Sequence, residues 1–197
     1  MKKVVIRILV ILVALIAVFG GVFALGYRLN PESAARANNS IGNDAHLVIK
    51  LNSSSVGELF VFKKLNYYIT TAPEKQGLFW ISNINFTTQD IDDKNDLVRS
   101  IGWLSITTQT QRGTVMIVQS HDKRVAYIEA GTAPNKEIEH ANKDGLFIFD
   151  WNQVYIPVQD SRPTAFSNSG KKLYIYSYSM KTPNYIDQKE LRWYAVT

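Results

Sequence analysis

The side chains that could do metal or acid–base chemistry are few, and they are spread along the chain. The histidines share neither a turn nor a helical spacing with one another; they are His46, His121 and His140. A metal site would need them to converge in space, because zinc is held by three or four protein ligands in one shell. No cysteine is present to complete such a site or to act as a thiolate nucleophile. We therefore predict isolated histidines, no metal site and no cofactor.

An acidic stretch offers oxygen ligands that could bind calcium, at Asp90, Asp92, Asp93 and Asp96. An EF-hand loop needs acidic or amide groups at positions 1, 3 and 5, glycine at position 6 and glutamate at position 12. Counted from Asp90, positions 5, 6 and 12 hold Lys94, Asn95 and Ile101. The motif fails at all three positions. We interpret the stretch as a solvated loop, with a looser oxygen-ligand site as the alternative.

A nucleophile is equally hard to assign. The run Ser179-Met180-Lys181-Thr182-Pro183 is similar, over these few residues, to the nucleophile box of membrane-anchored signal peptidases. Its Thr and Pro are inverted, it stands near the C-terminus, and no plausible lysine box follows, so we assign no membership of that family. The chain also lacks a G-x-S-x-G elbow and a Gly-rich phosphate loop. We predict no catalytic residues, and an anchored hydrolase remains a remote alternative.

Aromatic side chains are the most distinctive supply of binding chemistry. Tyr174, Tyr176 and Tyr178 alternate along one predicted strand and should project from the same face. Tyrosine is amphipathic and loses little conformational entropy when it is ordered, so this face could contact a protein partner. The alternative, which we favour, is cross-strand packing within a half-exposed sheet.

The element that positions everything else is an apolar segment at the N-terminus, residues 4–25. From Ile8 to Leu25 it contains no charged or polar side chain. These residues would reach about 27 Å as a helix, close to the ~30 Å hydrocarbon core of a bilayer. We predict a transmembrane signal-anchor helix. A secretory signal cleaved after Gly26 is the alternative, although its apolar region would run only about 7–15 residues.

Charged and aromatic residues flank this segment in a pattern typical of membrane interfaces. Lys2, Lys3 and Arg7 lie at its N-terminal end, and Tyr27 and Arg28 follow its C-terminal end. By the positive-inside rule the N-terminus stays in the cytoplasm, and the rest of the chain faces the periplasm or the cell exterior.

The overall charge argues against nucleic acid as a partner. The chain carries a net charge of +5, with 22 basic and 17 acidic residues, but three of the basic residues precede the apolar segment. The remaining basic residues are scattered singly and in pairs and form no stripe. The high pI therefore reflects the N-terminal end more than a binding surface.

After the apolar segment the chain changes character twice. Residues 28–45 are polar and read as a spacer, whereas residues 46–197 show period-two alternation typical of antiparallel strands. We expect one long or bent strand over Leu59–Thr71, a half-buried antiparallel strand over Leu78–Thr88, and a three-stranded meander over Trp103–Ala130. The fold class is an N-terminal transmembrane helix followed by a mainly antiparallel β domain, sandwich or jelly-roll/barrel like, with one or two short helices. The domains are thus 1–27, 28–45 and 46–197.

Two functions from different classes fit these features. The first is a membrane-anchored, non-catalytic interaction or assembly module of a cell-envelope complex, held in the bilayer through residues 4–25 and bound to a protein partner. The second is an anchored β-barrel or jelly-roll carrier, in which the apolar runs LFVF, LFWI and LFIF line a cavity for a lipid ligand.

Overall fold

The structure, a computed structural model, describes residues 2–89, 96–132, 136–155, 161–178 and 191–196. Strands make up 47% of the described residues, and the ladders between them are antiparallel. Two helices precede them, α1 (Lys2–Ala24) and α2 (Pro31–Arg36). The strands are β1 (His46–Ser53), β2 (Gly57–Lys64), β3 (Tyr67–Thr71), β4 (Glu74–Gln76), β5 (Phe79–Ile81), β6 (Asn85–Gln89), β7 (Val98–Thr107), β8 (Arg112–Ser120), β9 (Tyr127–Ala130), β10 (Glu137–His140), β11 (Leu146–Trp151), β12 (Thr164–Phe166), β13 (Lys172–Ser177) and β14 (Arg192–Ala195).

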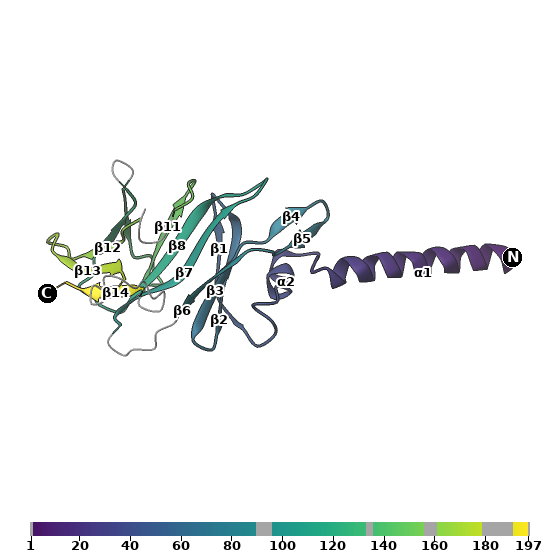
Figure 1. Cartoon of the computed structure of the whole chain (residues 1–197), viewed down its shortest axis with the longest axis horizontal. Helices are drawn as coiled ribbons and strands as arrows, with labels where there is room; N and C mark the ends of the chain where they lie inside the picture. The colour runs from purple at the N-terminus through teal and green to yellow at the C-terminus, as the bar shows by residue number, and fades with distance from the viewer. Residues whose placement is uncertain (1, 90–95, 133–135, 156–160, 179–190, 197) are drawn as a thin grey trace.

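The strands form three larger sheets and one separate hairpin, β4–β5. We name the sheets by their distance from α1 in Figure 1: proximal (β1-β2-β3-β6), central (β11-β8-β7) and distal (β10-β9-β12-β13-β14). One apolar cluster joins the proximal and central sheets, and another joins the central and distal sheets. The central sheet is therefore the middle layer of the domain. Among the described strands, no sheet closes into a barrel.

The middle layer explains the longest apolar run in the β domain. Val115, Met116, Ile117 and Val118 of β8 are consecutive, and all four are fully buried. Successive side chains of a strand point to opposite faces. Val115 and Ile117 pack toward the proximal sheet, and Met116 and Val118 pack toward the distal sheet. A strand covered on both faces reads as a continuous apolar run rather than as an alternation.

Three of the predicted strand assignments were wrong in how they divide the chain. Leu59–Thr71 is the hairpin β2–β3, which reverses at Leu65 with a φ of 51°. Leu78–Thr88 divides into β5 and β6, which belong to different sheets. The meander over Trp103–Ala130 ends after two strands, because β8 pairs next with β11 and β9 belongs to the distal sheet. The residues of β9 alternate between half-buried and buried, which suits an outer sheet rather than the middle one.

The polar segment 28–45 does not stand clear of the β domain as a spacer would. Asn30 caps α2 by accepting a 2.8 Å hydrogen bond from the Ser33 backbone N–H, and Pro31 begins the helix. The segment covers the outer face of the proximal sheet in a third apolar cluster, whose buried members are Ala35, Ile41, Ala45, Phe60, Phe62 and Ile69. Its few apolar residues are too widely spaced to give a periodic pattern in the sequence.

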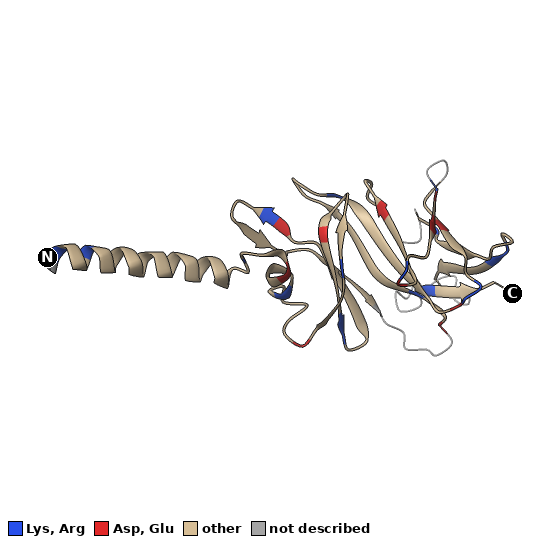
Figure 2. Ribbon diagram, turned by 180° about the vertical axis from the view of Figure 1, so that it is seen from behind, with Lys and Arg blue, Asp and Glu red and all other residues tan. Residues whose placement is uncertain are grey.

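α1 is a single long helix that projects from the β domain on the side of the proximal sheet (Figure 1). Within the described chain, it is the helix long and apolar enough to cross a membrane. No part of its apolar span, Lys3–Ala24, is buried against the rest of the protein. Figure 2 shows that charged residues on α1 lie toward its N-terminal end and that the remainder carries none.

Candidate functional site

The C-terminal end of α1 is closed by a specific backbone turn. The backbone N–H of Tyr27 donates to the carbonyl of Val22 at 3.3 Å, and that of Gly26 donates to Phe23 at 3.1 Å. This is the Schellman arrangement, which needs a left-handed residue just beyond the helix. Gly26 supplies it with a φ of 90°. The chain therefore leaves α1 in a defined direction.

Arg28 joins the end of α1 to the β4–β5 hairpin. Its guanidinium Nη1 turns back to donate to the carbonyls of Phe23 at 2.6 Å and Tyr27 at 2.7 Å. A cation at this end of a helix interacts favourably with the helix dipole. The backbone of Arg28 meanwhile exchanges two hydrogen bonds with Trp80, at 2.8 and 2.7 Å. One residue thus fixes both the helix end and the hairpin.

Aromatic side chains complete the contact between helix and hairpin. The Phe79 ring of β5 meets Phe19 of α1 edge-on, with 6.4 Å between centroids, and meets Tyr27 at 6.3 Å. The Tyr27 hydroxyl donates to Gln76 Oε1 at 3.0 Å. We call this group of contacts, from the last turns of α1 through Arg28 to the β4–β5 hairpin, the junction. It positions the β domain against the helix.

The sequence indicated the helix side of the junction but not the hairpin side. Lys2, Lys3 and Arg7 were predicted at one membrane interface, and they belong to the first turns of α1; the side chains of Lys3 and Arg7 are exposed. Tyr27 and Arg28, predicted at the other interface, are the residues that close α1. Phe79 and Trp80 were missed, because they were assigned to one long half-buried strand. A signal was present in the uncharged run from Gln76 to Gln89.

A polar cleft of about 370 Å³ opens beside the junction. Its walls come from the end of α1, the turn after α2 and the β5–β6 connection. Asn38 ties two of these walls together: its Nδ2 donates to the Ser82 carbonyl at 2.8 Å, and its Oδ1 accepts from Asn85 Nδ2 at 3.1 Å. No charged side chain lines the cleft among the described residues. Its amides are used to hold neighbouring segments together.

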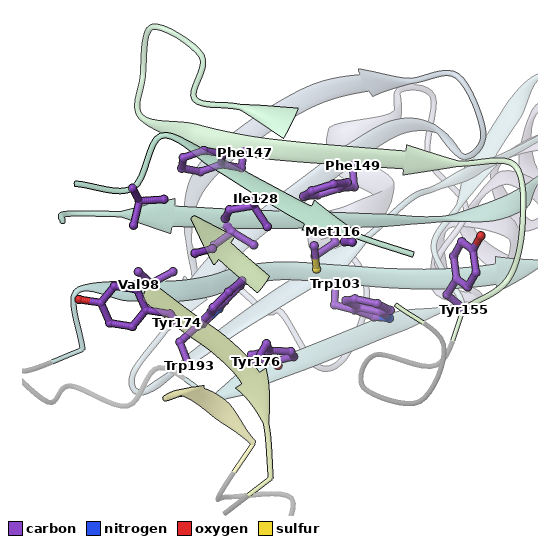
Figure 3. Close-up of a cluster of buried hydrophobic side chains, with 14 of the residues drawn as sticks. Val98, Trp103, Met116, Ile128, Phe147, Phe149, Tyr155, Tyr174, Tyr176 and Trp193 are labelled. Atoms are coloured by element: carbon purple, nitrogen blue, oxygen red, sulfur yellow. The ribbon is translucent and has the colours of Figure 1, made fainter. Parts of the chain in front are cut away.

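The tyrosine face predicted on β13 is not exposed. Tyr174 and Tyr176 are buried in the cluster between the central and distal sheets, together with Trp193 (Figure 3). Burial raises the pKa of Tyr176 to about 12. Tyr178 lies just beyond the strand and is half-buried. Tyr174 and Tyr176 therefore pack between the sheets, as in the cross-strand interpretation that we favour over a contact face, because large aromatic rings fill the space between two layers.

The opposite face of β13 is the one that faces outward. The strand registers form one row across all five strands of the distal sheet: Ile138, Glu129, Thr164, Ile175 and Tyr194. On β9, β12, β13 and β14, neighbours of these residues point into the core: Ile128, Ala130, Ala165, Tyr174, Tyr176 and Trp193. Ile138 remains 54% exposed, and Glu129 pairs with Lys136. We call this set of five residues the distal row.

Two carboxylates that could suggest acid–base chemistry are instead structural clamps. Asp122 accepts from Arg124 Nη2 at 2.7 Å and from the Tyr174 hydroxyl at 2.7 Å. The hydrogen bonds from Arg124 hold the pKa of Asp122 well below its usual range, against desolvation, and Tyr174 lowers it further. The carboxylate remains ionised and fully engaged.

The second clamp joins the proximal and central sheets. Asp150 of β11 accepts from the hydroxyls of Ser53 at 2.8 Å, Ser54 at 3.0 Å and Ser55 at 2.5 Å, and from the Ser54 backbone N–H at 2.6 Å. Burial alone raises the pKa of Asp150, but the hydrogen bonds from these serines outweigh it and lower the pKa below its usual value. The carboxylate fixes the β1–β2 turn against the central sheet.

The remaining candidates do not assemble into a reactive site. His46, His121 and His140 are exposed on separate elements, and His140 Nδ1 lies 3.1 Å from the Ala126 carbonyl. Within the described ranges, no group of three His, Cys, Asp or Glu side chains could hold a metal ion. Asp90, Asp92, Asp93, Ser179 and Lys181 lie outside the described residues.

The described geometry can therefore position a β domain at the end of an apolar helix and present the distal row away from it. Comparison of the chain with protein-family models, with curated proteins and with solved structures finds no match.

Proposed function

We propose that this chain is a single-pass membrane protein whose non-catalytic β domain binds a protein partner on the extracytoplasmic side of a cell envelope. The observation that carries the proposal is the exposure of α1. The β domain buries apolar side chains in three clusters, whereas no residue of the 22-residue span Lys3–Ala24 is buried. An apolar helix of about 33 Å needs hydrocarbon around it, and a bilayer core is about 30 Å thick.

The orientation follows from the charges at the start of α1. Lys2, Lys3 and Arg7 precede the uncharged run, and the first turn of the helix contains no acidic residue. The positive-inside rule keeps that end in the cytoplasm. The β domain then lies in the periplasm or outside the cell, with Tyr27 and Arg28 at the outer interface.

The packing supports an interaction module over a lipid carrier. Two of the apolar runs that could have lined a cavity, LFVF and LFIF, fill closed layers instead, and Phe60, Phe62, Phe147 and Phe149 are essentially inaccessible. Two clefts among the described residues, of about 370 and 340 Å³, have mainly polar linings. We infer a sandwich-type arrangement in preference to a jelly roll or barrel, because the clusters lie between sheets.

The distal row is the surface that we assign to the partner. It combines Ile138, Ile175 and Tyr194 with polar neighbours on the sheet farthest from α1. Apolar and aromatic side chains with a polar surround are typical of protein interfaces. A partner seated there would not compete with the bilayer at the other end of the domain.

Anchoring and topology are tested on the full chain, which contains no native cysteine. Leu65→Cys should react with a membrane-impermeant maleimide added to intact cells, and Lys3→Cys should react only after the membrane is opened. The protein should resist alkaline extraction and retain its N-terminus. Mature protein that begins at Tyr27, or labelling in the reverse pattern, would contradict the proposal.

Partner binding is tested by co-purification from detergent-solubilised membranes. Ile138→Asp combined with Ile175→Asp should remove a protein that co-purifies with the wild type, because two charges would be desolvated in the interface. Leu65→Asp is the matched control, since Leu65 is 81% exposed on the β2–β3 turn of the proximal sheet. Equal recovery of the partner with both variants would exclude the distal row.

A further inference from the structure

The tip of the β4–β5 hairpin is an exposed apolar surface that the proposed function does not use. Gly77 turns the hairpin with a φ of 62°, and Leu78 next to it is 83% exposed. Phe79 and Trp80 follow directly. Figure 1 shows the hairpin projecting from the β domain on the side of α1, and Figure 2 shows its charged residues on β4 rather than at its tip. An exposed leucine beside two aromatic residues calls for a specific partner.

We infer that this hairpin tip inserts into the outer lipid interface and forms a second attachment of the β domain to the bilayer. The inference rests on the proposed anchoring of α1. It adds a contact between the folded domain and lipid, so the domain would be braced against the membrane at two points.

The contact between Phe79 and Phe19 sets the depth of the hairpin. Phe19 lies five residues before the end of α1, about 7–8 Å inside the helix end at 1.5 Å per residue. The ring of Phe79 is 6.4 Å from that of Phe19. If lipid surrounds α1 at Phe19, it reaches Phe79 too, so the surface that covers the helix is continuous with the hairpin.

The chemistry around the tip matches a lipid interface better than a protein pocket. Tryptophan and tyrosine are enriched at headgroup depth, and here Trp80 and Tyr27 flank Phe79. Lys75 stands one strand away with its Nζ 5.9 Å from the Trp80 ring, where an ammonium group can meet lipid phosphate. The run that begins at Gln76 contains no charged side chain, so it avoids the large cost of bringing a charge into this region.

The decisive experiment measures depth at three single cysteines in the full chain, reconstituted in phosphatidylcholine–phosphatidylglycerol vesicles. Nitroxide labels at Leu12→Cys, Leu78→Cys and Leu65→Cys report collisions with oxygen, which concentrates in hydrocarbon, and with a water-soluble nickel chelate. We expect the oxygen-to-nickel ratio at Leu78→Cys to exceed that at Leu65→Cys severalfold and to approach that at Leu12→Cys. Leu78 and Leu65 both lie at turns and are almost equally exposed. Without a membrane contact, their labels would therefore give equal oxygen-to-nickel ratios.

The same labels separate the two proposals. The label at residue 12 could lie in hydrocarbon while the label at residue 78 is as accessible to the nickel chelate as the label at residue 65. That result would overturn the hairpin contact and leave the anchor standing. A wet label at residue 12 would overturn the anchor and the hairpin contact together.

A second measurement requires no cysteine. The other three tryptophans, Trp103, Trp151 and Trp193, are buried in the cluster between the central and distal sheets. Lipids brominated on the acyl chains should therefore quench part of the emission of the wild-type protein, and Trp80→Phe should abolish that quenching. Unchanged quenching in Trp80→Phe, or none in the wild type, would contradict the inference.

Discussion

The two faces of the central sheet are packed with different kinds of side chain. Toward the proximal sheet the cluster is mostly aliphatic, with Leu104, Ile106, Val115 and Ile117 as typical members. Toward the distal sheet it is mostly aromatic; its rings belong to Trp103, Phe147, Phe149, Trp151, Tyr155, Tyr174, Tyr176 and Trp193. The same three strands therefore support two cores of different composition.

The two partner sheets also differ in strand length. The strands β1 and β2 of the proximal sheet have eight residues each, whereas the distal strands have three to six. Three of the eight rings, Tyr174, Tyr176 and Trp193, come from the distal strands, and the other five come from β7, β11 and the residues that follow β11. The clamps differ as well: Asp150 is held by neutral serine donors, and Asp122 is held by an arginine and a tyrosine. The distal layer is therefore packed with large rings from both sides and held by a charged clamp.

The largest expected effect comes from truncating one core residue on each face. Phe149→Ala on the aromatic face should lower the free energy of unfolding by about 3–5 kcal/mol, and Leu104→Ala on the aliphatic face by about 2–5 kcal/mol. Both residues are essentially inaccessible. Urea unfolding of the full chain in detergent, followed by circular dichroism, measures both. Because the central sheet belongs to both cores, each variant should retain a single transition; a split transition in Phe149→Ala alone would show that the distal layer unfolds independently.

An intermediate effect should come from adding a methyl group at the aliphatic side. A Cβ at Gly113 would come within 3.0 Å of Ser55 and of the Trp151 backbone carbonyl, and that carbonyl cannot rotate away. Gly113→Ala should therefore destabilise the domain by about 1–3 kcal/mol, as overpacking does. Gly102→Ala is the matched control, since its nearest neighbours are side-chain atoms of Ile117 and Val61 at 3.1 and 3.2 Å, which need to move by only a few tenths of an ångström. A larger decrease in melting temperature in Gly102→Ala than in Gly113→Ala would refute the prediction that the contact at Gly113 is the more restrictive one.

The smallest expected effects separate the two clamps. Asp150→Asn and Asp122→Asn should each reduce stability at neutral pH by about 1–2 kcal/mol, because several hydrogen bonds to an ionised carboxylate are weakened. Both folded pKa values lie below the ordinary pKa of an aspartate, so each clamp contributes fully above that ordinary pKa and is lost as pH falls through the folded pKa. The pKa of Asp122 is lowered further, because its main donor is a cation.

Acid titration checks that order. The stability difference between wild type and Asp150→Asn should shrink as the pH falls below about 3.8, while the difference for Asp122→Asn persists to lower pH. Unfolding curves measured at a series of pH values provide both differences. If the stability difference for Asp122→Asn disappeared at a higher pH than that for Asp150→Asn, Arg124 would not hold its carboxylate more strongly than the serines hold Asp150.

The sequence was informative wherever one pattern had one structural meaning. The uncharged run predicted α1, and the alternation after His46 predicted antiparallel strands, both of which the structure confirms. Alternation also sorted Tyr174 and Tyr176 onto one face of β13 and Ile175 onto the other. It could not say which face is covered, because both carry residues that bury well.

Other features depended on contacts distant in sequence. The pairing of β8 with β11, rather than with β9, depends on which strands need cover on both faces, and this is set by the stacking of whole sheets. The junction depends on Phe79 meeting Phe19, sixty residues earlier in the chain. The turn at Leu65 was hidden because leucine rarely adopts a positive φ.

For the proposed membrane-anchored protein, the short connection at Arg28 has a mechanical consequence for how the proposed partner would be found. Only Leu25, Gly26 and Tyr27 separate the end of α1 from the residue whose backbone pairs with Trp80. A connection this short transmits rotation, so turning α1 about its axis in the bilayer would turn the distal row with it. The domain would search for its partner by diffusion in two dimensions, at one height above the lipid. A membrane-bound partner of matching height would meet it at a high effective concentration, whereas one anchored at another height would be excluded whatever its affinity.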